Sequence, residues 1–131
     1  MSGVKVDTIS NVAGTQSVDT GDLIDKACCM AWVNYDGSAV SGTSSDAIRD
    51  AFNVDTITDI ATGKHTINFT NALPNVNYAV VCGGGRSLTG PVTDGIVGFY
   101  NATTSSVTIE ASNGAGAFED FPAICIAIFG N

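Results

Sequence analysis

A D-T-G tripeptide at Asp19, Thr20 and Gly21 is the pattern in this chain with the most direct link to catalysis. Aspartic proteases carry catalytic aspartates on paired loops, so that two carboxylates share one proton. Residues 16–18 do not form the apolar strand that would hold such a loop, and short motifs often match by chance. We therefore expect a coincidence, and a hydrolase that uses Asp19 is the least favoured of the alternatives.

The cysteines and the single histidine do not form a metal-binding pattern. Cys28, Cys29, Cys82 and Cys125 include no C-x-x-C pair, and His65 begins a predicted strand, where we expect it to face solvent. Cys82 and Cys125 lie in apolar runs, so buried free thiols are expected. Whether Cys28 or Cys29 forms a disulfide is left open by the sequence. We expect no catalytic residue, no metal and no cofactor.

Two glycine-rich segments, residues 83–91 and 113–120, are predicted to be loops. The first lacks the Lys-Ser/Thr pair of a phosphate-binding loop, so a contact role is the functional interpretation. Tyr35 and Tyr100 end predicted strands and are expected to be exposed. The candidate contact residues are Tyr35, Arg86, Ser87, Leu88, Thr89, Tyr100 and Phe118.

Composition excludes several classes of function. Of the 131 residues 14% are charged, against about 25% in an average protein, and the net charge is -8 with only 5 Lys and Arg. Nucleic-acid binding needs clustered cations, so it is not expected. No apolar run is long enough to insert into a membrane, and the N-terminus does not resemble a signal peptide. Synthesis in the cytoplasm is therefore expected.

The elements that must position these residues are predicted to be strands. Residues 64–70 alternate, with Ile67 and Phe69 on one face, whereas residues 78–82 are apolar on both faces. Pro74 marks the corner between them. Further strands are predicted in residues 27–35, 54–60, 92–100, 105–111 and 122–129, and residues 46–52 are either a helical turn or a strand.

This spacing of strands predicts an all-β fold, an antiparallel β-sandwich or jelly-roll-like domain in residues 26–131. Residues 1–25 form a predicted extended N-terminal arm with isolated apolar residues and no core of its own, so it is either flexible or ordered against a partner. Strands that are apolar on both faces also invite burial between subunits. The candidate attachment residues of the arm are Val4, Val6, Ile9 and Val12.

Two segments resemble phage virion proteins. W-V-N-Y-D-G at residues 32–37 is followed in order by similar blocks at residues 47–54, 57–59, 63–70 and 77–81, as in the C-terminal domains of many phage tail fibres. Residues 4–15 resemble the N-terminal parts of such fibres, including those of cyanophages.

The resemblance implies a homotrimeric virion protein whose arm contacts other virion proteins and whose β-domain faces outward. We expect a non-enzymatic short tail or head fibre that contacts a host surface glycan or protein. The alternative is a capsid-decoration (cement) protein that stabilises the phage head.

Overall fold

The computed structural model describes residues 8–10, 17–19, 29–87 and 95–130. The elements in these residues are strands apart from one short 3-10 turn, η1. They are β1 (Thr8–Ser10), β2 (Ser17–Asp19), β3 (Cys29–Tyr35), η1 (Gly37–Ala39), β4 (Thr43–Ser44), β5 (Ile48–Phe52), β6 (Val54–Ala61), β7 (Lys64–Phe69), β8 (Ala79–Gly85), β9 (Gly95–Tyr100), β10 (Ser106–Asn113) and β11 (Ala123–Phe129). No helix in the described residues has the length and apolar character needed to span a bilayer.

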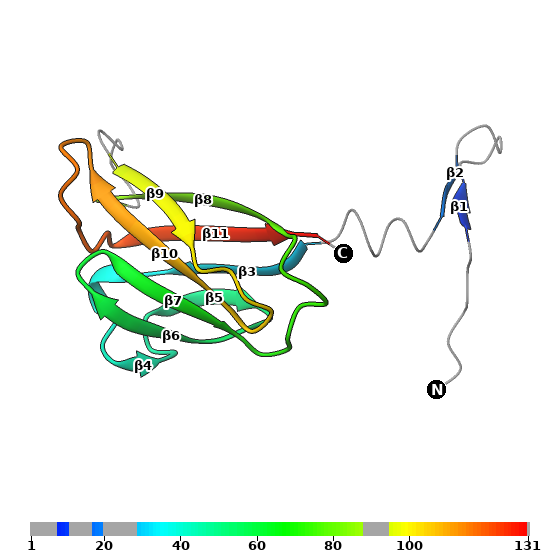
Figure 1. The fold of residues 1–131 in the computed structure, drawn as a ribbon, viewed down its shortest axis with the longest axis horizontal. Helices are drawn as coiled ribbons and strands as arrows, with labels where there is room; N and C mark the ends of the chain where they lie inside the picture. The colour runs from blue at the N-terminus through cyan, green and yellow to red at the C-terminus, as the bar shows by residue number, and fades with distance from the viewer. Residues whose placement is uncertain (1–7, 11–16, 20–28, 88–94, 131) are drawn as a thin grey trace.

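Two antiparallel sheets pack face to face, which confirms the predicted all-β sandwich (Figure 1). One sheet has the strand order β4-β6-β7-β10-β9 and the other the order β5-β3-β11-β8. Only some of the strands that are adjacent in sequence pair with each other. Strand β6 pairs with β7, whereas β11 lies between β3 and β8, which are distant from it in sequence. The last strand of the chain is therefore central to its sheet.

Side chains at alternate positions of the strands point inward and form the core between the sheets. In β7 the side chains of His65, Ile67 and Phe69 are buried and those between them are half-exposed, as the period of two predicts. Ile67 pairs with Ile57 of β6 and with Val107 of β10, so one apolar row crosses three strands. Burial of each such side chain stabilises the fold by about 1.5–3 kcal/mol.

Two expectations about local structure are settled by the described residues. Residues 48–52 form strand β5, so the helical interpretation of residues 46–52 is wrong. The glycine triplet 83–85 is not a loop, because β8 continues to Gly85 and pairs with β11. Gly84 suits this position, since a Cβ there would lie 2.8 Å from Cγ2 of Val97.

The described cysteines, Cys29, Cys82 and Cys125, are free thiols. Cys82 is half-buried and packs against the core, and Cys29 donates a hydrogen bond to the carbonyl of Ala31. Cys125 is exposed, so the prediction that it is buried is wrong. It lies on β11, where alternate residues face away from the core, and no layer of the described chain covers that side.

Part of the predicted arm is described. β1 pairs with β2 in antiparallel register, with Ile9 opposite Val18 and Thr8 opposite Asp19. Val4, Val6 and Val12, the rest of the D-T-G tripeptide and the predicted boundary at residues 25 and 26 lie outside the described residues.

We predict that Ile57→Ala lowers the free energy of unfolding by about 2–5 kcal/mol, because it leaves a cavity in the core. Ile60→Ala on the same strand is the matched control, since Ile60 is 52% exposed, and it should change stability by no more than about 0.5 kcal/mol. Urea unfolding measures both. Equal losses in the two variants would contradict the position of the core.

Candidate functional site

The sandwich has a chain-connection end and an opposite end, which we call the distal end. Cys29 at the start of β3 pairs with Phe129 at the end of β11. The first and last strands of the sandwich therefore begin and end at the same end, which is the chain-connection end (Figure 1). The described part of the distal end consists of residues 36–42, 62–63, 86–87 and 114–122. The described parts of the two predicted contact loops that fall here are residues 86–87 and 114–120.

A chain of polar side chains behind the distal end leads from the core to the surface. The hydroxyl of Tyr35 lies 3.2 Å from Nδ1 of His65, and Nε2 of His65 lies 3.6 Å from Oδ1 of Asp120. The carboxylate favours a ring proton on Nε2, so the tyrosine hydroxyl donates to Nδ1. These contacts join the two sheets, because Tyr35 belongs to β3 and His65 to β7.

Two predictions about these residues are wrong. Tyr35 is fully buried rather than exposed, so it is not a contact residue, and His65 is 1% exposed rather than solvated. Inward alternation in β3 and β7 places both side chains in the core. Asp120 is distant in sequence, and a single sequence gives no signal that pairs it with His65.

The environment shifts the pKa values of both rings. Burial lowers the pKa of His65 from its ordinary value of 6.5, and the nearby carboxylates of Asp120 and Asp59 offset part of this effect. Burial also raises the pKa of Tyr35, with smaller contributions from Cys82 and Asp120. Both groups are therefore neutral in the folded protein, as a hydrogen-bonded core requires.

Asp120 also fixes the neighbouring turn. Its Oδ1 accepts a hydrogen bond from the backbone N–H of Gly63, between β6 and β7. Gly63 has φ +68°, and a Cβ at this position would collide with the carbonyl oxygen of Ala111. Only glycine meets both conditions. The backbone N–H groups of Ala111 and Glu119 continue the ladder, bonding to the carbonyls of Gly63 and Ala111.

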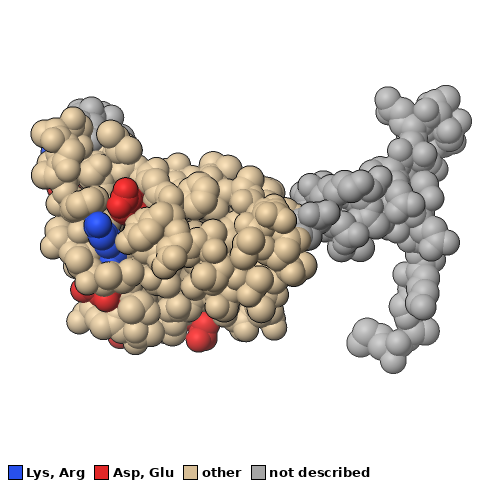
Figure 2. Space-filling model, in the orientation of Figure 1, with Lys and Arg blue, Asp and Glu red and all other residues tan. Residues whose placement is uncertain are grey.

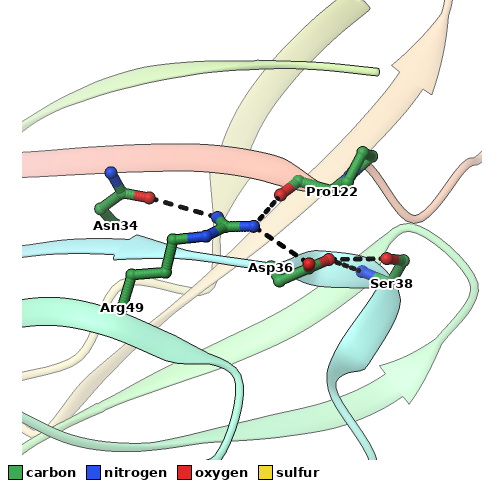
Figure 3. A network of polar contacts seen from close by, with 5 residues as sticks. All are labelled: Asn34, Asp36, Ser38, Arg49 and Pro122. Atoms are coloured by element: carbon green, nitrogen blue, oxygen red, sulfur yellow. Dashed lines mark hydrogen bonds and ion pairs between the residues drawn. The ribbon is translucent and has the colours of Figure 1, made fainter. Parts of the chain in front are cut away.

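A second network, shown in Figure 3, surrounds the guanidinium of Arg49. Nη2 donates to the carbonyl of Pro122 at 2.6 Å and to Oδ2 of Asp36 at 3.0 Å, and Nη1 donates to Oδ1 of Asn34 at 3.3 Å. The other carboxylate oxygen of Asp36 accepts from the backbone N–H and hydroxyl of Ser38. One cation thus joins β3, β5 and the segment before β11.

Arg86 and Glu119 join the two segments that the sequence analysis selected for contact. Nε and Nη2 of Arg86 donate to the two carboxylate oxygens of Glu119 at 2.7 and 2.6 Å. This pairing lowers the pKa of Glu119. The arginine is exposed but ion-paired, so it acts first as a clamp between loops. Ser87 is half-buried, and Leu88 and Thr89 lie outside the described residues.

Tyr100 and Phe118 are the predicted contact residues that the structure leaves accessible, at 40% and 46% exposure. Nζ of Lys64 lies 4.2 Å from the ring centroid of Phe118 and 6.0 Å from that of Tyr100. It also lies 3.8 Å from a carboxylate oxygen of Glu110. In Figure 2 the basic atoms of the visible face lie only toward its left end, and most of that face is uncharged.

This arrangement can bind but has no evident catalytic geometry. The buried imidazole of His65 has no access to a substrate, and its neighbours Tyr35 and Asp120 are committed to structural hydrogen bonds. Within the described ranges no three His, Cys, Asp or Glu side chains form a cluster that could hold a metal ion. Exposed rings beside a lysine and a carboxylate instead suit a ligand with both apolar and polar groups.

Comparison with protein-family models, with curated proteins and with solved structures finds no match to this chain. Function must therefore be argued from its own residues.

We predict that stability falls as the pH is lowered below about 6.5. The pKa of His65 is lower in the folded state than in the unfolded chain, so the unfolded chain binds more protons in this window. Above the unfolded pKa this contribution is constant. Thermal unfolding between pH 8 and pH 5 measures the effect. His65→Gln should be less stable but should depend less on pH in this window, and an equal dependence would contradict the assignment.

We predict that Arg49→Gln lowers the free energy of unfolding by about 1.5–3 kcal/mol, because hydrogen bonds to three acceptors are lost. Arg86→Gln is the matched control, since its ion pair with Glu119 is more exposed and such surface pairs add little. Urea unfolding compares the two. A larger loss in Arg86→Gln would mean that the loop clamp, not the Arg49 network, holds the distal end.

Proposed function

We propose that this chain is a non-enzymatic structural protein of a phage virion, a short tail or head fibre whose sandwich presents its distal end to the host surface. The order of the tail-fibre-like blocks between residues 32 and 81 supports the class of protein. The polarity of the sandwich is the observation that carries the proposal. Both connections of the domain leave from one end, so the opposite end is free to point away from the particle.

A binding end must hold its shape, and three sets of contacts support this property. The Tyr35–His65–Asp120 chain, the Arg49 network and the Arg86–Glu119 pair each join segments that are far apart in sequence. Preorganised loops lose little conformational entropy when they bind. The distal end is therefore suited to binding a partner.

Phe118 at the distal end and Tyr100 on the outer side of β9 are the residues proposed to meet the host, and both rings lie near Nζ of Lys64. Aromatic rings stack on the apolar faces of sugars and on protein side chains, and the Lys64–Glu110 pair adds polar partners beside them. A host glycan or protein is the proposed partner. The arm, with the candidate residues Val4, Val6, Ile9 and Val12, comes before β3 in the sequence, and we propose that it attaches to other virion proteins.

The test compares virions of the phage that encodes the chain with virions that lack it. A fibre predicts slower adsorption to host cells and unchanged resistance of the particles to heat. A cement protein predicts the reverse, and no change in either would contradict both roles.

We predict that the double variant Tyr100→Ala and Phe118→Ala, carried on virions, slows adsorption by about tenfold or more, since each lost aromatic contact is worth about 0.5–1.5 kcal/mol. Ile60→Ala is the control, because it removes an exposed apolar side chain elsewhere. Incorporation into particles is measured by mass spectrometry. Normal adsorption with normal incorporation would overturn the assignment of these rings.

A further inference from the structure

The outer side of the β5-β3-β11-β8 sheet is largely apolar, with Asn34 and Asp50 as its polar pair, although no described segment covers it. Phe52, Trp32, Ala127 and Val81 are directly opposite one another in the strand registers, so they form a row across all four strands. Phe52 is 53% exposed and Val81 60%. With Cys125 and Phe129 of β11, these residues define what we call the apolar face.

The other sheet shows what an outer side looks like when water covers it. There the corresponding row in β4, β6, β7 and β10 is Thr43, Thr58, Thr66 and Thr108, and its hydroxyls hydrogen-bond in pairs at 2.9 and 3.1 Å. The row ends at the exposed Tyr100 of β9. Asn68 donates to the hydroxyl of Thr58 in the same layer. Continuous apolar patches on a protein surface mark interaction sites, so the contrast between the two sheets indicates an occupant for the apolar face.

The apolar face has a bulky side and a hollow side. A trough of about 500 Å³ runs along β11 between Trp32 and Val81, with small residues Cys125, Ala127 and Gly83 beneath it. Phe52 projects from the edge strand β5 beyond Trp32. The face therefore carries both an exposed aromatic ring and an apolar trough of a size that accepts one.

We propose that a second copy of this chain docks on the apolar face, with Phe52 of each copy in the trough of another. Charge favours a copy as the occupant. The chain carries a net charge of -8, so two copies repel wherever their carboxylates meet, yet the four strands of this sheet contain a single acidic residue, Asp50 on the edge. This sheet is where copies approach with least repulsion.

The asymmetry of the face also sets the direction of packing. Phe52 meets a trough only when the strands of both copies run the same way, because the opposite orientation places Phe52 against Phe52. Parallel copies point their distal ends in one direction, as the proposed fibre requires. This proposal rests on the proposed fibre function for the biological role of the assembly. A two-fold and a three-fold arrangement both use this contact.

A cysteine cross-link tests the contact. Phe52 and Cys125 lie on strands separated by β3, and two strand spacings alone place these strands about 9.6 Å apart. Cys125 is also two residues along β11 from the register partner of Trp32, so the pair lies beyond the Cα separation of about 7 Å that a disulfide spans. Phe52→Cys therefore cannot bond to Cys125 within one copy. Under mild oxidation it should give a covalent oligomer on a non-reducing gel, which Cys125→Ser abolishes. Ile60→Cys on the other sheet is the control. It should run as a single chain on the non-reducing gel, because no cysteine of another copy lies near it in the proposed contact.

Mass in solution supplies the second measurement. Val81→Lys places an unpaired charge in the contact and should raise the dissociation constant by about a hundredfold or more, whereas Ile60→Lys should leave the assembly intact. Light scattering should report a multiple of 13.3 kDa for the unchanged protein and for Ile60→Lys. The single tryptophan, Trp32, lies in the contact, so its emission should shift to longer wavelength on dilution.

Three results would overturn the proposal: a monomeric unchanged protein, no cross-link from Phe52→Cys, or an assembly that Val81→Lys does not weaken. Each would assign the face to another segment of the chain or to a different protein. Failure of the fibre role is separate. An assembly that behaves as expected but is absent from virions would leave this contact in place and overturn the proposed function.

Discussion

Enclosing one imidazole between two sheets is the constraint on which much of this structure depends. A buried histidine needs a polar partner at each ring nitrogen. A buried ring nitrogen without such a partner costs about 1–3 kcal/mol of folding free energy. Tyr35 supplies one partner from the facing sheet and Asp120 the other from the segment before β11. The position of β3 over β7 and the path of residues 113–122 are therefore linked.

The same constraint extends to the surface. Once Asp120 is held by His65 and by the N–H of Gly63, the adjacent Glu119 faces Arg86 and the nearby Phe118 lies over Lys64. The exposed rings that we propose for host contact thus rest on this chain of polar side chains. This coupling explains how a glycine-rich loop can present a defined surface without regular structure of its own.

The two outer sides of the sandwich differ because their strands differ in sequence pattern. Strands β6, β7 and β10 alternate apolar residues with threonine, serine and asparagine, so one side can face water. Strands β8 and β11 are apolar on both sides, and β11 is central to its sheet. One side of this domain therefore favours solvent, and the other favours another protein surface.

The sequence by itself determined the all-β class, most of the strands and the two-faced apolar character of residues 78–82 and 124–129, because period and composition are local properties. It also selected Tyr100 and Phe118 correctly as accessible. Tertiary structure alone decided that Tyr35 and His65 are buried, that residues 83–85 continue a strand and that Cys125 is exposed. Each depends on which strand lies beside which, and pairing between distant segments leaves no mark in the local sequence of either.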